Sequence, residues 1–553
     1  MKKVLLFVSI SILFLLSSCD FHAIRVKKAI SGISKDEMVD YVKVLGSDEY
    51  QGRKPFTIGE EKTLAYLENE FREIGLEPAN NGSFYQDVPM VEVAVSPDEN
   101  MEIRSGYKKI NLKYKDEFVA FSRRLSDKIE IKNSDLIFAG YGIVAPEYGW
   151  NDYKDIDVKD KIVIVMVNDP GFGTTNKDLF NGNSMTYYGR WTYKYEEAAR
   201  QGAKGLLIIH QTKPAGYPFS VVLNGASIPK LYLEPEDDYM SRCAMEGWLT
   251  LDAAHKVFKK LNINLDEEME KAKSREFKAF SLGAKLSFNM QSEHKFAVTK
   301  NLMGYIKGSK HPDEVIIYSA HWDHLGIGPV QNGDSIYNGA VDNGTSLAWM
   351  MEIAEAFKTF RKAPERSIMF IATTSEEQGL LGAKYYVKNP VFPLSKTVAN
   401  INNDLMLPFG RYKDVMITGS GQSELEDYVA EFAKKQDRYI FPDPNPHTGM
   451  YYRADHFAFA KAGVPALFAR GNCDSREYGK EWAAKMEKNW LENFYHKPTD
   501  EYDANIWDLS GIEEDAKLLF RVGNKLANEK TFPKWKDGSE FKSTREECMN
   551  KNN

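Results

Sequence analysis

Cysteine is scarce in this sequence, and there is no excess of positive charge. The 553 residues include four cysteines, and the three beyond residue 20 allow at most one disulfide with one thiol left over. No pairing among Cys243, Cys473 and Cys548 is predicted. Lys and Arg number 72 against 79 Asp and Glu, a net charge of −7, and no basic block stands out. The chain therefore lacks the charge pattern of a protein that binds nucleic acid.

Long apolar runs are absent after residue 19, so no transmembrane helix is predicted there. The first nineteen residues differ, because Lys2-Lys3 precedes an apolar run from Val4 to Leu16, the order found in an export signal. The run Leu16-Ser-Ser-Cys19 resembles a bacterial lipobox, and the alternative is an ordinary signal peptide with a chance cysteine. The resemblance implies a lipid on Cys19 that anchors an exported protein to a membrane, on its periplasmic or cell-surface side.

Internal repeats and low-complexity stretches are missing as well. Hydrophobic residues make up 43% and charged residues 27% of the chain, the composition of a globular protein. A chain of 553 residues is too long for one ordinary domain, so two or three domains are expected.

Potential metal ligands follow predicted buried strands in the second half of the chain. Residues 314–319 form a short, apolar, β-branched run that predicts a strand leading to His321-x-Asp323. Residues 344–360 contain good helix formers at helical spacing, so Asp342 directly precedes a helix. Open α/β sheets bind their ligands at this edge, which makes His321 and Asp342 candidate ligands.

Three later segments carry further candidates. A predicted strand at 367–374 leads to Glu376-Glu377, a second ends at Asp404, and a polar loop carries His496. Imidazole and carboxylate ligands without cysteine suit zinc, or cobalt and manganese, as a hydrolytic metal. The alternation of strands and helices predicts an α/β fold with a doubly wound mixed sheet.

In chain order, the motifs H-x-D, D-N-G-T, E-E, N-x-x-x-D and H resemble those of the co-catalytic di-zinc exopeptidases. This family includes bacterial leucyl-type aminopeptidases, glutamate carboxypeptidase II and the glutaminyl cyclases. The resemblance covers roughly residues 36–95 and 296–528, and it implies two zinc ions. The implied roles are His321 and Asp404 on one zinc, Glu377 and His496 on the other, Asp342 bridging both, Glu376 as general base, and Asp323 orienting His321.

The implied chemistry explains these residue types. Two metals about 3.5–4 Å apart can share one carboxylate and one water, and they make hydroxide available near neutral pH. Adjacent side chains at a strand end point in different directions, so Glu376 is free to take the water proton and pass it to the leaving amine. His321 and Asp323 share one face of an extended segment, where a carboxylate can fix the far imidazole nitrogen.

The resemblance also divides the chain. Residues 36–95 and 296–528 are predicted to form the catalytic domain. Residues 96–295 read as a β-rich block with one helix that resembles a protease-associated domain, most clearly in the run Gly-Ala-Lys-Gly-Leu-Leu-Ile at 202–208. In the family such insertions cover or narrow the cleft. Residues 529–553 are polar and Lys-rich, and a loosely held tail is expected there.

Residues 451–465, in the predicted catalytic domain, give weaker signals. Asp455-His456 matches a family motif, D-H-x-x-F-x-x-x-G-x-P, whose residues lie near the cleft without binding metal. Tyr451 or Tyr452 is a candidate donor to an oxyanion, and the spacing does not choose between them.

The leading functional hypothesis is an aminopeptidase that removes N-terminal residues from exported or extracellular peptides. A glutamate-type carboxypeptidase would need clustered arginines for the substrate carboxylate, and Arg453, Arg470 and Arg476 are scattered. A glutaminyl cyclase normally lacks the inserted domain. A non-catalytic binding protein would not need the complete set of ligands. The sequence leaves open the side-chain preference, the native metal and the oligomeric state.

Overall fold

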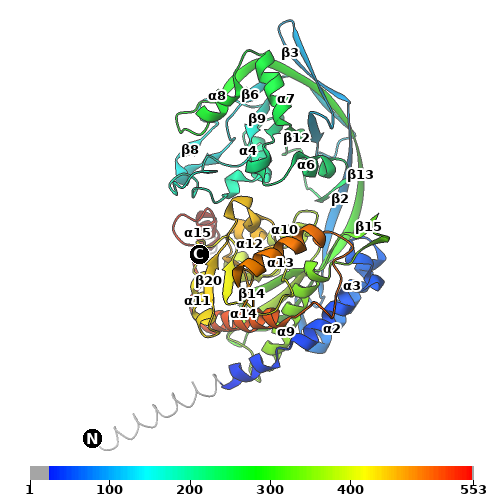
Figure 1. Cartoon of the computed structure of the whole chain (residues 1–553), viewed down its shortest axis with the longest axis vertical. Coiled ribbons are helices and arrows are strands. Elements are labelled where there is room, and N and C mark those ends of the chain that lie inside the picture. The colour runs from blue at the N-terminus through cyan, green and yellow to red at the C-terminus, as the bar shows by residue number, and fades with distance from the viewer. Residues whose placement is uncertain (1–23, 551–553) are drawn as a thin grey trace, which may run out of the picture. The chain divides into compact units, whose positions relative to one another are not determined.

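The computed structural model describes residues 24–550 and divides them into two compact units (Figure 1). Unit 1 contains residues 24–88, 299–443 and 454–550, and unit 2 contains residues 89–298 and 444–453. The chain leaves unit 1 within strand β2 (Tyr85–Pro97) and returns at the end of β13 (Phe280–Ile306). The predicted export signal and its Cys19 lie outside the described residues.

Unit 1 is built on a mixed sheet whose central strands are parallel. Strand β14 lies between β17 and β18, parallel to both, and β21 continues the parallel set beside β18. Both neighbours of β14 come later in the chain, so the strand order reverses at β14. This arrangement confirms the predicted doubly wound mixed α/β sheet, and in such sheets ligands bind beyond the carboxyl end of the strand at which the order reverses, here β14. The strands are, in spatial order, β1 (Glu77–Pro78), β13, β17 (Arg366–Thr373), β14 (His311–His321), β18 (Thr397–Asn402), β21 (Ala466–Arg470), β19 (Asp414–Ile417) and β20 (Tyr439–Pro442).

Helices cover both faces of this sheet. On one face α9 (Ser346–Lys358) and α14 (Ser510–Asn528) pack on β14, where the buried Tyr318 hydroxyl donates to the carbonyl of Leu519 over 2.8 Å. On the other face α10 (Leu381–Lys388) and α12 (His456–Lys461) bury aromatic side chains against each other. Unit 1 also contains α2 (Lys35–Leu45), α3 (Ile58–Ile74), α11 (Leu425–Lys434), α13 (Gly479–Asn493) and α15 (Lys542–Asn550), and a hairpin of β15 (Gly326–Gln331) and β16 (Asp334–Tyr337).

Unit 2 has a core of its own around four parallel strands. These are β6 (Lys128–Phe138), β9 (Ile162–Met166), β10 (Gly205–Ile209) and β12 (Met245–Leu249), and the last three are buried throughout. The helix predicted before residue 202 runs from Trp191 to Arg200. Other elements are β3 (Asn100–Ser105), β4 (Lys108–Lys113), β5 (Phe118–Phe121), β7 (Val144–Ala145), β8 (Trp150–Asn151), β11 (Lys230–Leu233), α4 (Trp191–Arg200), α5 (Thr212–Ala215), α6 (Phe219–Ala226), α7 (Leu251–Lys260) and α8 (Leu265–Lys271).

The segment after α14 is packed rather than loose. Trp535 and Phe541 are buried, and the Arg545 guanidinium of α15 donates to the carbonyls of Leu394 and Thr397 over 2.7 and 2.9 Å. The predicted loosely held polar tail is therefore wrong for these residues. Polar sequence separates Trp535, Phe541 and Arg545 from one another, so no apolar run signalled their packing.

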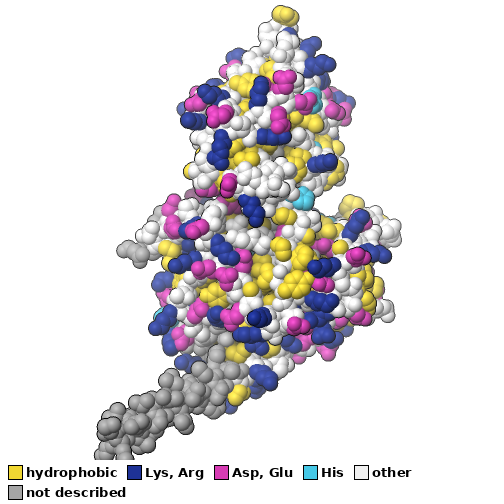
Figure 2. All heavy atoms as spheres, turned by 60° about the vertical axis from the view of Figure 1, so that its left-hand side comes forward, with side chains coloured by type: hydrophobic (Ala, Val, Ile, Leu, Met, Phe, Trp, Pro, Cys, Tyr) yellow, Lys and Arg dark blue, Asp and Glu magenta, His cyan; other side chains and the backbone are white. Residues whose placement is uncertain are grey.

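The chain carries charges of both signs on its surface. Figure 2 shows Lys and Arg interspersed with Asp and Glu on the face that it presents. Among residues 24–550, no helix combines the length and apolarity needed to cross a bilayer. No disulfide joins Cys243, Cys473 and Cys548 to one another.

Candidate metal centre

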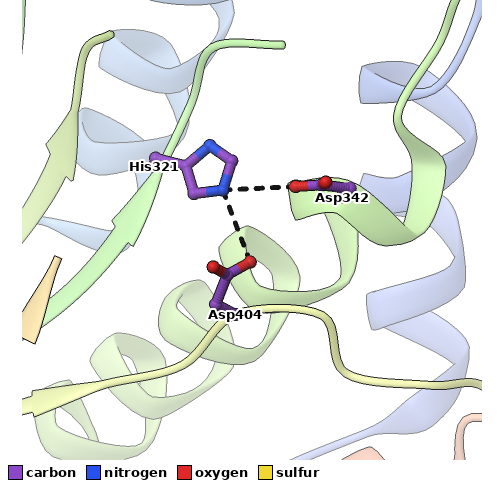
Figure 3. Close-up of side chains that lie close together, drawn as sticks. All are labelled: His321, Asp342 and Asp404. Carbon is purple, nitrogen blue, oxygen red and sulfur yellow. Dashed lines mark ion pairs between the residues drawn. The ribbon is translucent and has the colours of Figure 1, made fainter. Parts of the chain in front are cut away.

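The first cluster of candidate ligands forms at the carboxyl end of β14 (Figure 3). His321 is the last residue of that strand, and its Nε2 lies 3.3 Å from Asp342 Oδ1 and 3.4 Å from Asp404 Oδ1. Asp342 lies in the turn that precedes α9, and Asp404 follows β18. All three side chains are buried, so they form a group that can hold a metal ion.

A second cluster shares Asp342 with the first. The other Asp342 oxygen, Oδ2, lies 3.3 Å from His496 Nε2, and Glu377 Oε2 lies 3.1 Å from the same nitrogen. The two oxygens of one carboxylate therefore face two different histidines. This is the arrangement expected of a carboxylate between two metal ions, and it brings together all five predicted ligands.

His324 belongs to this centre and was missed by the sequence analysis. It is fully buried, and its Nδ1 lies 2.8 Å from Glu377 Oε1, the oxygen that does not face His496. His324, Asp342 and Glu377 also form a group that can hold a metal ion. The available signal was the His-x-x-His spacing from His321, which places a second imidazole in the same polar segment.

Asp323 contacts more than His321. The His321 Nδ1 lies 3.0 Å from the backbone carbonyl of Asp323, and the Asp323 carboxylate is farther away, at 3.7 Å. That carboxylate accepts the backbone N–H groups of Glu376, over 3.0 Å, and Glu377, over 3.4 Å. Burial raises the pKa of Asp323 to about 7. The residue thus joins the strand end of His321 to the Glu376-Glu377 turn.

The two adjacent glutamates differ in their preferred charge. Burial raises the pKa of Glu376 well above its ordinary value. Burial acts in the same direction on Glu377, but His496 and the hydrogen bond from His324 outweigh it and lower the pKa of Glu377 to about 2. Glu376 is therefore suited to accept a proton, whereas Glu377 is suited to remain an ionised ligand.

Two buried residues hold the Asp342 turn in place. Asp500 accepts the backbone N–H groups of Val341 and Asp342 over 3.0 and 3.1 Å, and it lies four residues after His496. Arg53, fully buried, donates to several backbone carbonyls of the metal loops. Its acceptors are the carbonyls of Trp322, Leu45, Asn338, Gly339 and Asp342, at 2.6 to 3.1 Å.

Three residues at the centre adopt left-handed backbone conformations that side-chain-bearing residues rarely occupy. They are Ser375, Leu405 and His496, with φ of 53°, 53° and 56°. Ser375 precedes Glu376, and Leu405 follows Asp404. Sharp turns of this kind cost free energy and are common at functional sites, because they redirect side chains that regular strands would point elsewhere.

The residues present fit divalent metal ions with nitrogen and oxygen ligands. The buried His321 Nε2, His324 Nε2, His496 Nε2 and Asp404 Oδ1 have no hydrogen-bond partner. Buried polar atoms without partners are rare unless an ion or another group satisfies them. Of the weaker signals, Asp455 is buried and accepts the Thr373 hydroxyl, and Tyr451 and Tyr452 belong to unit 2.

Part of the chain is similar to known peptidases. Residues 301–518 match the model of Peptidase family M28. Aminopeptidase YwaD of Bacillus subtilis is 26% identical over 369 residues, and the match covers 65% of this chain and 62% of that protein. The glutamate carboxypeptidase 2 homolog of Caenorhabditis elegans is 35% identical over 130 residues, 23% of this chain and 16% of the relative. The chain thus matches less than two thirds of the length of either relative.

Among solved structures, an aminopeptidase from Aneurinibacillus sp. strain AM-1 is 16% identical, with a TM-score of 0.49 over 92% of this chain and 97% of that one. The family match spans the strands and loops that carry every ligand candidate, from His321 to His496. Through this region the chain is similar to peptidase family M28.

Proposed function

We propose that this protein is a metal-dependent aminopeptidase that removes N-terminal residues from exported or extracellular peptides. The observation that carries the proposal is the Asp342 carboxylate, whose oxygens face His321 on one side and His496 on the other. The matched family and the YwaD relative support a peptidase, and an aminopeptidase in particular.

The residues would hold two zinc ions. His321 and Asp404 would bind one, His496 and Glu377 the other, and Asp342 both, with His324 as a further ligand or as the hydrogen-bond donor that fixes Glu377. When bound, zinc polarises a carbonyl and lowers the pKa of water so that hydroxide is available near neutral pH.

Proton transfer would belong to Glu376. Its Oε2 lies 4.0 Å from His321 Nε2, close enough to face the reacting groups without joining the ligand set. Its raised pKa lets it take the proton of the attacking water and return it to the leaving amine. The Asp323 carboxylate positions Glu376 through its backbone N–H.

The other parts of the chain receive supporting roles in this proposal. Unit 2 would be a protease-associated domain, because the run 202–208, which leads into β10, resembles that domain. Such a domain would take no part in the chemistry. Lipidation of Cys19 would hold the enzyme at a membrane surface. Both roles agree with an exported peptidase.

The test is mass spectrometry of a mixed peptide pool incubated with the zinc-loaded protein. A ladder of products shortened from the N-terminus supports the aminopeptidase and reports its side-chain preference. Loss from the C-terminus would indicate a carboxypeptidase instead. Loss of ammonia only from peptides that begin with Gln would indicate a cyclase.

A further inference from the structure

Two arginines that are far apart in the sequence come together within unit 2. Arg190 is the N-cap residue of α4, and Arg453 ends the segment 444–453. A Cβ built on Gly449 would lie 3.4 Å from Arg190 Cδ, so the Arg190 side chain packs against that glycine. Arg453 Nη2 donates to the carbonyl of Thr448, the residue before Gly449, over 2.9 Å. The two side chains therefore converge on the same short stretch of backbone.

Neither arginine has an acidic partner. Among the described residues 24–550, no carboxylate lies within 4.0 Å of either guanidinium. Burial, followed by the charge of Arg453, lowers the pKa of Arg190 to about 10, and the strongest groups that oppose this shift are tyrosines. Arg453 Nε is buried without a hydrogen-bond partner. Two guanidinium charges held near each other repel, and an anion between them removes the repulsion.

The surroundings of the pair also favour an anion. The first turn of α4 contains no acidic residue and no side chain caps it, so the positive end of the helix dipole adds to the charge of Arg190. Tyr217 lies near both arginines, because burial raises its pKa while the charges of Arg190 and Arg453 lower it. Its hydroxyl is a further hydrogen-bond donor. All three side chains are only partly buried, so a ligand can reach them from solvent.

We propose that Arg190 and Arg453 bind the carboxylate of a peptide. A guanidinium presents two N–H groups in a plane that matches the two oxygens of a carboxylate, and two guanidiniums can bind one carboxylate together. The choice of a peptide as the source rests on the proposed function. The carboxylate is either the C-terminus of the peptide or an Asp or Glu side chain. Sequence analysis left Arg453 isolated because Arg190 belongs to the inserted block.

Calorimetric titration with three short peptides tests this site. The protein is zinc-loaded Glu376→Gln, in which no peptide should be cleaved during the titration. The probes are N-acetylated trialanine with a free C-terminal carboxylate, the same peptide as its C-terminal amide, and that amide with Glu at the central position. We expect the acid, the Glu-containing amide or both to bind about 10- to 100-fold more tightly than the plain amide. The probe that binds tightly identifies the source of the carboxylate.

Substitutions in the same background assign this difference to the arginines. Arg190→Met and Arg453→Met should each abolish it, and Arg190→Lys, which keeps the charge without the planar pair of donors, should restore only part of it. Arg104→Met, an exposed control on β3, should keep it in full. Thermal unfolding of each variant establishes that it is folded before it is titrated.

Equal binding of the three peptides would overturn the proposal. A difference that survives in both Met variants would overturn it as well, because another group, such as the bound zinc, would then hold the carboxylate. Cleavage by the wild type is measured separately. A protein that cleaves no peptide but keeps the arginine-dependent difference would refute the proposed function and leave the carboxylate site in place.

Discussion

At the scale of single residues, neighbours in sequence take on different chemistry because they face different partners. The Glu377 carboxylate contacts two imidazoles, those of His324 and His496. The Glu376 carboxylate is buried, and its distance to the nearest imidazole, that of His321, is 4.0 Å. The Asp323 carboxylate accepts the backbone N–H groups of both glutamates and so holds both in place. One glutamate can therefore remain a ligand while the other exchanges a proton.

Replacement of the proposed base tests this division. Glu376→Gln keeps the size and polarity of the side chain but cannot accept a proton, so we expect turnover to fall about 10²–10⁴-fold with metal content unchanged. Steady-state kinetics and metal analysis of the same sample measure both. Glu547→Gln, in α15, is the matched control. Full activity in Glu376→Gln would show that another group takes the proton.

His324 gives a second prediction at this scale. Removal of its hydrogen bond to Glu377 in His324→Phe should weaken metal retention about 10–100-fold, because groups that orient a ligand tune affinity by that amount. Chelator titration followed by metal analysis reports the affinity. If both metals are retained as in the wild type, His324 neither binds metal nor positions Glu377.

At the scale of elements, the centre depends on loops that are held by residues distant in sequence. Arg53 connects the strand-end loop at Trp322 with the turn at Asp342, and Asp500 ties that turn to the His496 loop. The strands deliver His321 and Asp404 to one edge of the sheet, but these buried contacts set where Asp342 lies between them.

Arg53 should therefore matter for both stability and metal binding. Arg53→Met leaves several buried carbonyls without a donor, so we expect a loss of about 3 kcal/mol or more in the free energy of unfolding. Urea denaturation measures this loss. Zinc retention should fall in the same variant, since the Asp342 turn loses its anchor, and the exposed Arg275→Met serves as a control. Unchanged stability would contradict the role assigned to Arg53.

The sequence predicted the strand ends better than the loops between them. His321, Glu376 and Asp404 follow apolar runs whose burial is visible in the residue pattern, so their meeting at one sheet edge could be inferred. The pairing of His324 with Glu377 spans 53 residues, and no local pattern signals it. The packing of α2 against α9 depends on which helices meet, and periodicity reports only that each helix has a buried face.

At the scale of the whole molecule, metal binding is coupled to protonation. Burial alone would lower the pKa of His496, but Glu377 and Asp342 raise it to about 10 in the metal-free protein. The pKa of His321 is also raised, by Glu376, Asp342 and Asp404, although burial opposes this. The metal-free centre thus holds protons that a metal ion must displace.

Zinc affinity should therefore rise with pH. Because His496 holds its proton up to a pKa of about 10 and the pKa of His321 is raised as well, zinc must displace protons below that pH. Zinc binding should therefore strengthen as the pH rises toward 10, and acid should release the metal. Metal content after dialysis at pH 5 and at pH 8 measures the effect. Equal retention at both values would mean that the histidines are not ligands.

The central claim is that the metal centre acts on peptides with a free N-terminus. The most direct measurement compares one peptide in free and N-acetylated forms, incubated with the zinc-loaded wild type and with Glu376→Gln, by mass spectrometry of the products. We expect stepwise loss of N-terminal residues from the free peptide with the wild type only, and no cleavage of the acetylated form. Cleavage of both forms, or shortening from the C-terminus, would contradict it.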